Sequence, residues 1–489
     1  MGLRLPMLLV VLSVLHSWAL AEERCVSPVA QVVSLQGQVK VTPVGERRWR
    51  PVQLRESFCA GDRVRIEAYS RAVVQLQEDT ILHLDAGTLV TFSNIEPEQP
   101  SWFELLKGAI HLISRFPHRL EVKTPFVNAA VEGTEFVIRV EPEQALLWVF
   151  EGRVLFHNPA GRLTLTNGEA AVAEAGQAPR RRLVIEPREA VQWTLYYPPL
   201  IDLRSNIYPR GPEAQEIHAA LRDYQAGNLL SALARLEQVP TEVREASYFT
   251  LQAALLLVVG RVDEARPKIQ RALQLNPDYG TAYALQSIIA LVQNQKEQAL
   301  RLAQQAADLD PQSPIPQIAL SYAHQAAFNI EKALKHAEQA IELFPGEALA
   351  WARVAELQLS LGDLDEAAKA AQQAVALEPD LARTQTVQGF AYLTEIKIDQ
   401  AKTAFEQAIA LDPADPLSRL GLGLAKIRQG DLKEGTQEIE IAASLDPNNS
   451  LIRSYLGKAY YEQKRGGISR DGVSYGQGAG SQRSHPLVL

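Results

Sequence analysis

The chain has 489 residues, of which 46% are hydrophobic and 22% are charged, and its formal net charge is −8. This length exceeds what one hydrophobic core usually supports, so we expect several domains of ordinary globular composition. The acidic balance argues against a nucleic-acid partner, because phosphate-binding proteins present a basic face. Two short basic clusters, "GERRWR" and "PRRR", are interpreted as solvated loops.

The N-terminus, residues 1–21, has the pattern of a cleavable signal peptide. Arg4 precedes the apolar run "LPMLLVVLSVLHSWAL", and "ALA" at 19–21 provides small residues for cleavage. No other segment approaches the roughly 18 apolar residues of a transmembrane helix. We therefore expect an exported chain, periplasmic or secreted, with association to the outer membrane as a further option.

The mature chain contains two cysteines, Cys25 and Cys59. In an oxidising compartment an even pair favours a disulfide, and two unpaired buried thiols are the alternative. The sequence has no Cys/His cluster with zinc-binding spacing. We expect no metal ion and no cofactor.

Residues 25–174 predict an all-β domain. Apolar and polar side chains alternate with a period of two, as in "QVVSLQGQVKVTP" and "RLTLTNGEAAVAE". Gly, Asp, Asn and Pro separate these runs, which is typical of roughly ten short strands joined by turns.

Several motifs in this region resemble the FecR-type domain, among them "GDRVRIEAYSRAVVQL", "VKTPFVNAAVEGTEFVI" and "VFEGRVLF". The founders of that family are envelope regulators that pass a periplasmic signal through a membrane helix to a sigma factor. The sequence shows no such helix, so the resemblance implies an exported β module that recognises an envelope glycan or protein. We interpret the glycines as turn and bulge positions rather than ligand contacts. The motif residues are Gly61, Asp62, Ser70, Arg71, Gly133, Thr134 and Gly152.

Residues 175–211 contain five prolines and predict a strand followed by an extended linker that docks the two domains. Trp193, Tyr196 and Tyr197 are the expected contacts, and a binding patch is the alternative. Residues 212–245 are interpreted as a degenerate leading helix pair, whose out-of-phase proline suits a cap.

Residues 246–464 repeat with a period of 34. Such a unit is typical of two antiparallel helices and a turn, with alanine where the helices cross closely and proline where the second helix ends. Units of this kind stack into an α-solenoid with a continuous core. The repeated positions are Ala265, Ala299, Ala333, Ala367 and Ala401, and Pro277, Pro311, Pro345, Pro379, Pro413 and Pro447.

This pattern resembles the tetratricopeptide repeat (TPR), with six full units and the first helix of a seventh. The resemblance implies a superhelix whose mainly apolar concave groove holds an extended or helical segment of a protein partner. The alternative is that these side chains form interhelical core. The candidate groove residues are Ile318, Tyr322, Glu356, Arg383, Phe390, Leu393, Leu424 and Ile427.

The tail, residues 465–489, loses the repeat pattern. If the bases that encode this tail are read one nucleotide later, the new codons can encode residues that fit the repeat. We therefore hypothesise that a frameshift precedes the tail. A disordered tail is the alternative, because the segment is rich in Gly and Ser.

The sequence lacks HExxH, GxSxG and phosphate-loop motifs, and we expect no enzyme. The predicted architecture is multidomain, with an all-β FecR-type domain followed by an all-α TPR superhelix. The first functional hypothesis is a non-enzymatic periplasmic or envelope scaffold. The alternatives are the N-terminal part of a longer outer-membrane TPR protein, and an envelope signalling regulator without its own membrane helix.

Overall fold

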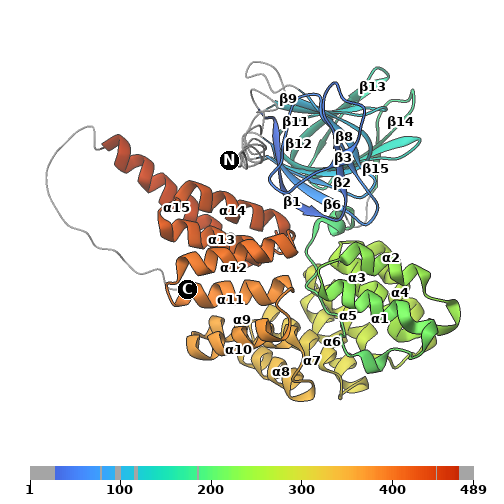
Figure 1. The fold of residues 1–489 in the computed structure, drawn as a ribbon. Helices are drawn as coiled ribbons and strands as arrows, with labels where there is room; N and C mark the ends of the chain where they lie inside the picture. Colours follow the sequence, from blue (N-terminus) through green and yellow to red (C-terminus); the bar gives the residue numbers. More distant parts are fainter. Residues whose placement is uncertain are drawn as a thin grey trace, which may run out of the picture.

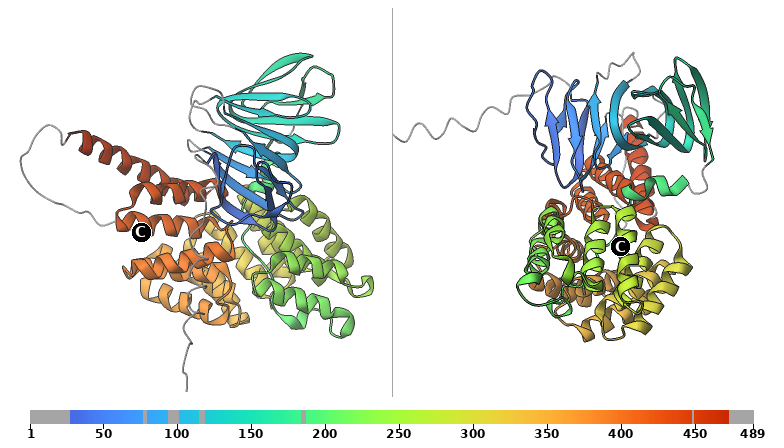
Figure 2. Two further views of the ribbon diagram at one scale, coloured as in Figure 1. Left: turned by 45° about the horizontal axis from the view of Figure 1, so that its top comes forward. Right: turned by 90° about the vertical axis from the view of Figure 1, so that its right-hand side faces the viewer.

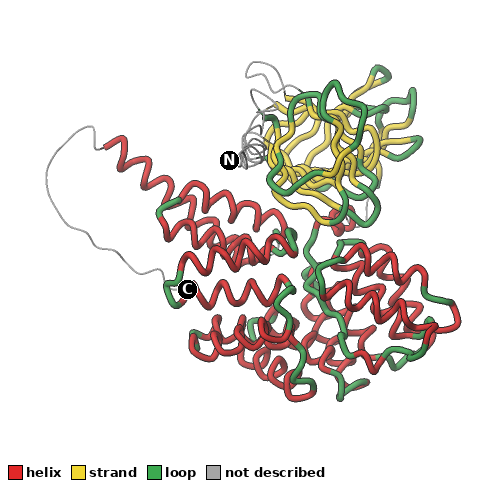
Figure 3. The backbone as a smooth tube through the Cα atoms, viewed as in Figure 1, coloured by secondary structure: helices red, strands yellow, loops and turns green. Residues whose placement is uncertain are grey.

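The structure is a computed structural model. Figures 1 and 3 show an N-terminal region of strands and a C-terminal array of paired helices, which confirms the predicted fold class. The predicted signal peptide (1–21) and Cys25 lie outside the described residues. The described residues are 28–76, 80–93, 101–114, 119–183, 187–447 and 449–472.

The β domain is one hydrogen-bonded sheet of fifteen strands, and among the described pairings only β9 and β10 run parallel. The main path of neighbours is β15-β14-β12-β11-β10-β9-β7-β6-β1-β4. The strands are β1 Ala30–Gln36, β2 Val39–Thr42, β3 Arg50–Pro51, β4 Ser57–Phe58, β5 Arg63–Ile66, β6 Arg71–Leu76, β7 Ile81–Leu84, β8 Leu89–Phe92, β9 Ser101–Ile113, β10 Arg119–Lys123, β11 Asn128–Val140, β12 Gln144–Asn158, β13 Gly161–Thr166, β14 Ala170–Glu174 and β15 Arg180–Arg182.

The sheet encloses a single core. Alternate residues of a strand point to one face, so the period of two in the sequence places the apolar set together. Val32 of β1, Phe103 of β9 and Phe156 of β12 belong to one buried cluster although they are far apart in the chain. Because residues from the first and the later strands share this cluster, the sheet must curl around it.

Strand β1 contains a register shift between Val32 and Ser34, where it pairs with β6. A bulge of this kind leaves one residue unpaired and turns its side chain to the other face. Val33 accordingly leaves the core and joins Val73 and Ile81 in a second apolar cluster, on the face turned toward the helices.

The helical array follows the predicted period. Each second helix ends at the leucine two residues before the periodic proline, as α8 does at Leu343 before Pro345. The intervening Phe344 is extended (φ −147°, ψ 90°), which is the conformation that a residue before proline favours, and its N–H donates to the Ala340 carbonyl at 3.0 Å. The helices are α1 Gln215–Gln225, α2 Leu229–Gln238, α3 Ala246–Val258, α4 Val262–Leu275, α5 Gly280–Val292, α6 Lys296–Leu309, α7 Pro314–Ala326, α8 Ile330–Leu343, α9 Ala348–Leu361, α10 Leu364–Leu377, α11 Ala382–Thr394, α12 Ile398–Leu411, α13 Pro416–Gln429, α14 Leu432–Leu445 and α15 Ser450–Gly472.

The periodic alanines lie where the helices cross. Ala265, Ala299, Ala333, Ala367 and Ala401 are all 0% exposed. At full burial a larger side chain would push the helices of a pair apart, so the period in the sequence reflects a steric limit.

Two predicted segments differ in part from the structure. The sequence predicts a strand and then an extended linker over residues 175–211; the strand is β15 at 180–182, but the linker contains the 3₁₀ helix η2 (Pro187–Thr194). Helix α15 runs to Gly472, past the predicted start of the tail at 465, because adding a residue to an existing helix needs no new nucleation. Residues 473–489 lie outside the described residues.

The turn between the two helices of each unit contains one residue in the left-handed backbone conformation, with positive φ. Residues with a Cβ are strained in this conformation and glycine is not. Ile396 (φ 61°) is β-branched and its side chain is 75% exposed, so no packing contact compensates for its conformation. The equivalent positions, all with positive φ, are Gly260, Asn294, Phe328, Gly362, Ile396 and Gly430.

We predict that Ile396→Gly stabilises the array. The substitution relieves the left-handed strain at the cost of some unfolded-state entropy, so the free energy of unfolding should rise by about 1 kcal/mol. Urea-induced unfolding measures this change. Gly430→Ala is the matched control, because a Cβ at Gly430 meets no atom within 4 Å and tests the backbone alone; it should lower stability. A loss of stability in Ile396→Gly would contradict the prediction.

Candidate functional site

The candidate site is the junction where the β domain, the linker and the helical array meet. Figure 2 shows the β domain placed across the array, next to its first and its last helices. Tyr69 of the β domain donates to Glu237 Oε1 of α2 at 3.0 Å, and Ser34 donates to the Pro413 carbonyl after α12 at 2.8 Å. The β domain therefore bridges repeats that are distant in sequence.

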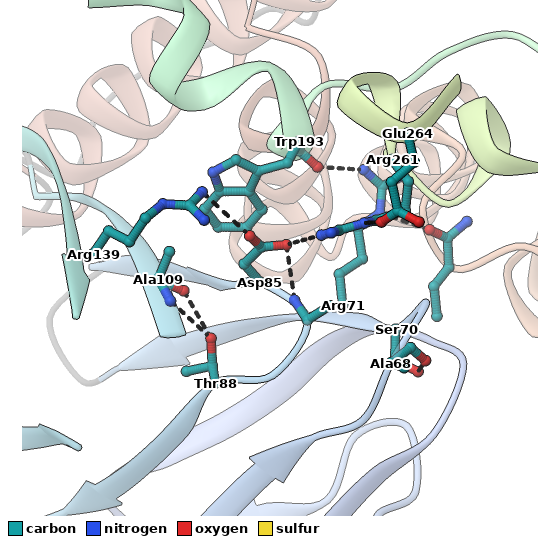
Figure 4. Close-up of polar contacts among 12 residues, drawn as sticks. Ala68, Ser70, Arg71, Asp85, Thr88, Ala109, Arg139, Trp193, Arg261 and Glu264 are labelled. Carbon is teal, nitrogen blue, oxygen red and sulfur yellow. Dashed lines mark hydrogen bonds and ion pairs between the residues drawn. The ribbon is translucent and has the colours of Figure 1, made fainter. Parts of the chain in front are cut away.

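Arg71 of β6 lies at the centre of this junction (Figure 4). Its Nε donates to Gln36 Oε1 at 2.6 Å, and its Nη1 donates to the carbonyls of Trp193 and Leu195 at 2.9 and 3.0 Å. Burial lowers the pKa of the Arg71 guanidinium, and the nearby Asp412 carboxylate opposes that shift. One buried side chain thus connects β1, β6 and the linker.

The same guanidinium reaches the end of helix α3. Arg71 Nη2 and Gln36 Nε2 each lie 3.4 Å from the carbonyl oxygen of Val258, the last residue of α3. Terminal carbonyls lack partners within their helix, and a cation at the C-terminus also suits the helix dipole. Gly260 follows with φ +75°, and a Cβ there would lie 2.5 Å from Arg71 Nη1. The glycine therefore permits both the turn and the close approach.

Asp85, after β7, forms a second bridge to the array. Its Oδ1 lies 3.1 Å from Arg261 Nη1 at the start of α4, and its Oδ2 lies 3.5 Å from Arg139 Nη2 of β11 (Figure 4). Burial raises the pKa of Asp85, while Arg261 and then Arg139 oppose that shift. The carboxylate is 4% exposed and stays matched by two arginines, one from each domain.

The bulge of β1 makes the contact with the last repeats. The carbonyl of Val33, at the register shift, accepts a hydrogen bond from Arg419 Nη2 of α13. Arg419 Nη1 also donates to Glu438 Oε2 of α14 at 2.7 Å. The Val33 side chain packs with Ile441 and Leu445 of α14. The bulge thus supplies both the free carbonyl and the apolar side chain.

The linker runs along the predicted concave face of the array. Tyr197 and Tyr208 belong to the same buried cluster as helices α1 to α9. Arg204 Nη2 donates to Ser313 Oγ, before α7, at 2.9 Å. Burial raises the pKa of the Tyr196 hydroxyl well above its ordinary value, and the nearby Asp415 carboxylate adds to the shift. The linker therefore passes the beginnings of several successive first helices.

Three of the predicted groove residues belong to one charged network. Glu356 forms ion pairs with Arg383 at 2.7 Å and with Arg353 at 2.8 Å. Arg383 also pairs with Asp415 at 3.3 Å, and the Arg353 guanidinium lies 4.1 Å from the centre of the Tyr322 ring. The network connects α7, α9, α11 and the start of α13, and Tyr196 of the linker lies beside it.

The other predicted groove residues pack into the interior. Ile318 and Leu393 are 2% and 1% exposed. Phe390, Leu424 and Ile427 are partly buried against the clusters of the last repeats, and Leu54 of the β domain packs against one of these clusters. Most of these side chains therefore pack against neighbouring helices of the array, as in the alternative of an interhelical core, and the β domain reaches the last repeats through Leu54.

A cavity of about 340 Å³ remains at the junction, lined by Gln36, Tyr196, Pro199, Arg383 and Asp412, among others. Gln36 Nε2 donates to Asp412 Oδ1 at 2.9 Å. Burial and then the neighbouring Asp415 raise the pKa of Asp412 to about 6. The cavity between the β domain and the array thus lies beside a carboxyl group whose pKa is raised by burial.

Among the motif residues of the β domain, the polar ones mostly hold turns. Asp62 accepts from the N–H groups of Val44 and Cys59 at 3.0 and 2.9 Å. Ser70 Oγ accepts from Gln38 N–H at 2.9 Å. Cys59 is disulfide-bonded, and its predicted pairing with Cys25 involves a residue outside the described ones.

The motif glycines lie at tight backbone positions. Gly133 and Gly152 have φ +60° and +84°, where the pairing of β11 with β12 is irregular. A Cβ on Gly152 would lie 2.6 Å from the Gly133 carbonyl and from Thr134 Cγ2. Gly61, with φ +91°, has no room for a Cβ beside Val44. Arg71 of the motif set donates hydrogen bonds to both the linker and the array.

Sequence reasoning did not select Gln36, Asp85, Arg261, Arg419 or Asp412. None of them stands at a periodic position that would distinguish it. The one available signal was a charged residue, Arg419, within the apolar run "LSRLGLGLA" of α13. Among the described residues no group of three His, Cys, Asp or Glu could hold a metal ion. No helix in that part of the chain is long and apolar enough to cross a membrane.

Comparison with protein families agrees with this architecture. Residues 62–155 match the FecR protein family, and residues 250–314, 318–382 and 388–450 match the tetratricopeptide repeat. The chain combines a FecR-type domain with a TPR array. FecR-type domains are associated with the cell envelope, and both modules are generally non-enzymatic and serve protein interaction or signalling.

Solved structures with similar parts are distant. The Cut9–Hcn1 hetero-tetramer of APC/C shares 20% identity with a TM-score of 0.38, over 52% of this chain and 50% of that one. A thermophilic TPR protein of Thermus thermophilus shares 19% identity with a TM-score of 0.33, over 37% and 99%. A candidate anti-sigma factor from Parabacteroides distasonis shares 19% identity with a TM-score of 0.25, over 33% and 74%. No curated protein matches the sequence.

Glu347, before α9, gives a pH-dependent prediction. It is 0% exposed and neither carboxyl oxygen has a hydrogen-bond partner. Burial and then Asp202 raise its pKa to about 8. Because the folded pKa lies above the unfolded value, the stability that the neutral acid contributes is complete below about pH 4.5 and is lost as the pH rises through about 8.

Glu347→Gln should remove this dependence, because glutamine is neutral at every pH. The free energy of unfolding of this variant minus that of the unsubstituted chain should increase with pH, and the difference should reach about 1–3 kcal/mol near pH 8. Denaturant unfolding at several pH values measures the difference. Glu331→Gln, on the exposed side of α8, is the control and should show no such trend. A difference independent of pH would refute the assignment.

Proposed function

We propose that the chain is a non-enzymatic periplasmic or envelope scaffold. In this proposal the TPR array binds a segment of a protein partner, and the FecR-type domain recognises an envelope component. The observation that carries the proposal is the junction at Arg71, because one side chain links the FecR-type domain to the linker that covers the inner face of the array. The family matches support the two interaction roles.

The occupied inner face sets a condition on partner binding. A partner segment that enters this face must displace the linker, which now contributes Tyr196, Tyr197 and Tyr208 to the interior. An extended chain segment already fits there, so the face accommodates an extended ligand. The FecR-type domain and the linker together cover the inner face of the array. Loss of the contacts that they make with the array is the step that exposes this face to a partner.

The chemistry of the junction is compatible with such opening. Arg71, Arg419 and Ser34 each donate to backbone carbonyls across the junction. When the domains separate, water replaces these partners, so the net free energy of each bond is small compared with its strength in isolation. Interfaces between domains of one chain are typically more polar than a core and permit relative motion.

A signalling regulator is the second candidate, and the same junction favours it. A ligand that moved β6 of the FecR-type domain would move Arg71, which holds the C-terminal carbonyl of α3. Both candidates therefore place the functional coupling at one residue.

The first test removes the coupling with Arg71→Met, which keeps an apolar stem but leaves the carbonyls of Trp193, Leu195 and Val258 without this donor. We expect the junction to weaken by about 3 kcal/mol. Hydrogen exchange of the linker amides should accelerate at least tenfold while exchange within α7 and α8 stays unchanged. Arg162→Met, at an exposed arginine of β13, is the control and should leave linker exchange unchanged.

Partner binding is then tested in the source bacterium with a photo-crosslinking residue in place of Tyr322. We expect crosslinks to an envelope protein in the Arg71→Met background, and mainly crosslinks within the chain when Arg71 is retained. Crosslinks confined to the chain in both backgrounds would refute a partner site on the inner face. Crosslinks to the same partner at equal yield in both backgrounds would refute the proposal that the linker must be displaced before the partner binds.

A further inference from the structure

A basic surface patch on the FecR-type domain lies outside the junction. It is formed by β2, β5 and the loop before β3, and β2 pairs with β5 in the sheet. The chain as a whole carries a net charge of −8, so this concentration of positive charge is a local exception. The basic patch consists of Lys40, Arg47, Arg48, Arg63 and Arg65.

Two cations of the basic patch face each other directly. Lys40 and Arg65 are cross-strand partners of β2 and β5. Like charges at directly opposed positions destabilise a sheet. One carboxylate offsets this, because Glu67 Oε1 lies 3.0 Å from Lys40 Nζ and 2.8 Å from Arg65 Nη2. A single negative charge is therefore shared between two positive ones.

The other three cations of the basic patch lack a carboxylate partner among the described residues. Arg47, Arg48 and Arg63 have no carboxylate within ion-pair distance in the described part of the chain, and the side chains of all three are exposed. The basic patch thus keeps several arginines whose guanidinium groups are available to an external anion.

An aromatic ring lies among these arginines. The guanidinium carbons of Arg65 and Arg63 lie 4.6 and 5.9 Å from the centre of the Trp49 ring. Contact with the ring holds the two guanidinium groups close to the sheet, which reduces the entropy lost when they bind. Trp49 itself is only partly buried. Tryptophan, tyrosine and arginine are enriched among the residues that contribute most to binding at protein interfaces.

We propose that the basic patch binds an anionic glycan, a polysaccharide whose sugar units carry carboxylate or phosphate groups. The planar guanidinium fork pairs with either group through two hydrogen bonds. A sugar ring presents C–H groups that can pack on the exposed part of Trp49, a contact that charge alone does not provide. This proposal gives a chemical class to the envelope component in the proposed function and rests on that role for the FecR-type domain.

The residues of the basic patch all belong to the FecR-type domain. None of the five cations of the basic patch contributes to the contacts of Arg71, Asp85 or Arg419 at the junction. The acidic remainder of the chain should repel a polyanion, so electrostatic attraction directs the glycan to this one face. Glycan binding here and partner binding on the inner face of the array can therefore be tested separately.

The test measures binding of the full chain to an oligogalacturonate by calorimetry at low and at high salt. Binding should be measurable at about 50 mM salt and weaker at about 300 mM, because the attraction is screened. Arg47→Gln/Arg48→Gln removes two charges without breaking an ion pair and should weaken binding at least tenfold. Arg271→Gln/Arg301→Gln, at exposed positions on the array, makes the same charge change and should have little effect.

Trp49→Leu distinguishes a glycan from other anions. It should weaken oligogalacturonate binding by several-fold more than binding of poly-glutamate of equal charge, because the peptide loses only the ordering of Arg63 and Arg65 while the glycan also loses the ring contact. Equal losses for both probes would indicate an acidic peptide site and refute the glycan. Tighter binding to phosphatidylglycerol vesicles than to oligogalacturonate would also refute the glycan. So would the absence of oligogalacturonate binding at low salt. So would a loss of affinity in Arg271→Gln/Arg301→Gln equal to that in Arg47→Gln/Arg48→Gln. None of these outcomes would alter the crosslinking result at the array, so the two proposals fail independently.

Discussion

The architecture depends on the burial of one positive charge. A guanidinium group cannot leave water unless its N–H groups find acceptors, because the desolvation cost is otherwise prohibitive. The acceptors of Arg71 come from β1, from the linker and from the end of α3. These three segments therefore converge at Arg71, and this contact, together with Asp85–Arg261 and Arg419–Val33, sets how the FecR-type domain meets the array.

The closure of the array follows from this arrangement. Once the linker is held at Trp193 and Leu195, the residues after it continue along the beginnings of the first helices, and Arg204 reaches Ser313. The leading helix pair closes the opposite side, where Gln225 donates to Glu378. The inner face, which an isolated solenoid would expose to solvent, thus becomes interior. Its charged residues Glu356 and Arg383 form an ion pair with each other.

The molecule presents two contrasting surfaces. The inner face of the array is covered by the linker, whose tyrosines are buried, and the FecR-type domain adds hydrogen bonds to backbone carbonyls at the junction. The basic patch around Trp49 is already exposed and its arginines are only partly matched. A ligand on the FecR-type domain and a protein segment on the array would thus act at separate places that Arg71 connects.

The sequence by itself determined the features that repeat at a fixed interval. Alanine at each helix crossing, proline after each second helix and alternation in the strands are local steric requirements, so they leave a periodic trace at positions such as Ala333 and Pro345. The motif around Arg71 also identified the FecR-type domain. Only the tertiary structure decided what Arg71 binds and what covers the predicted groove. Ser34 and Pro413 are 379 residues apart, and a single contact over such a distance has no period and no local composition that could reveal it.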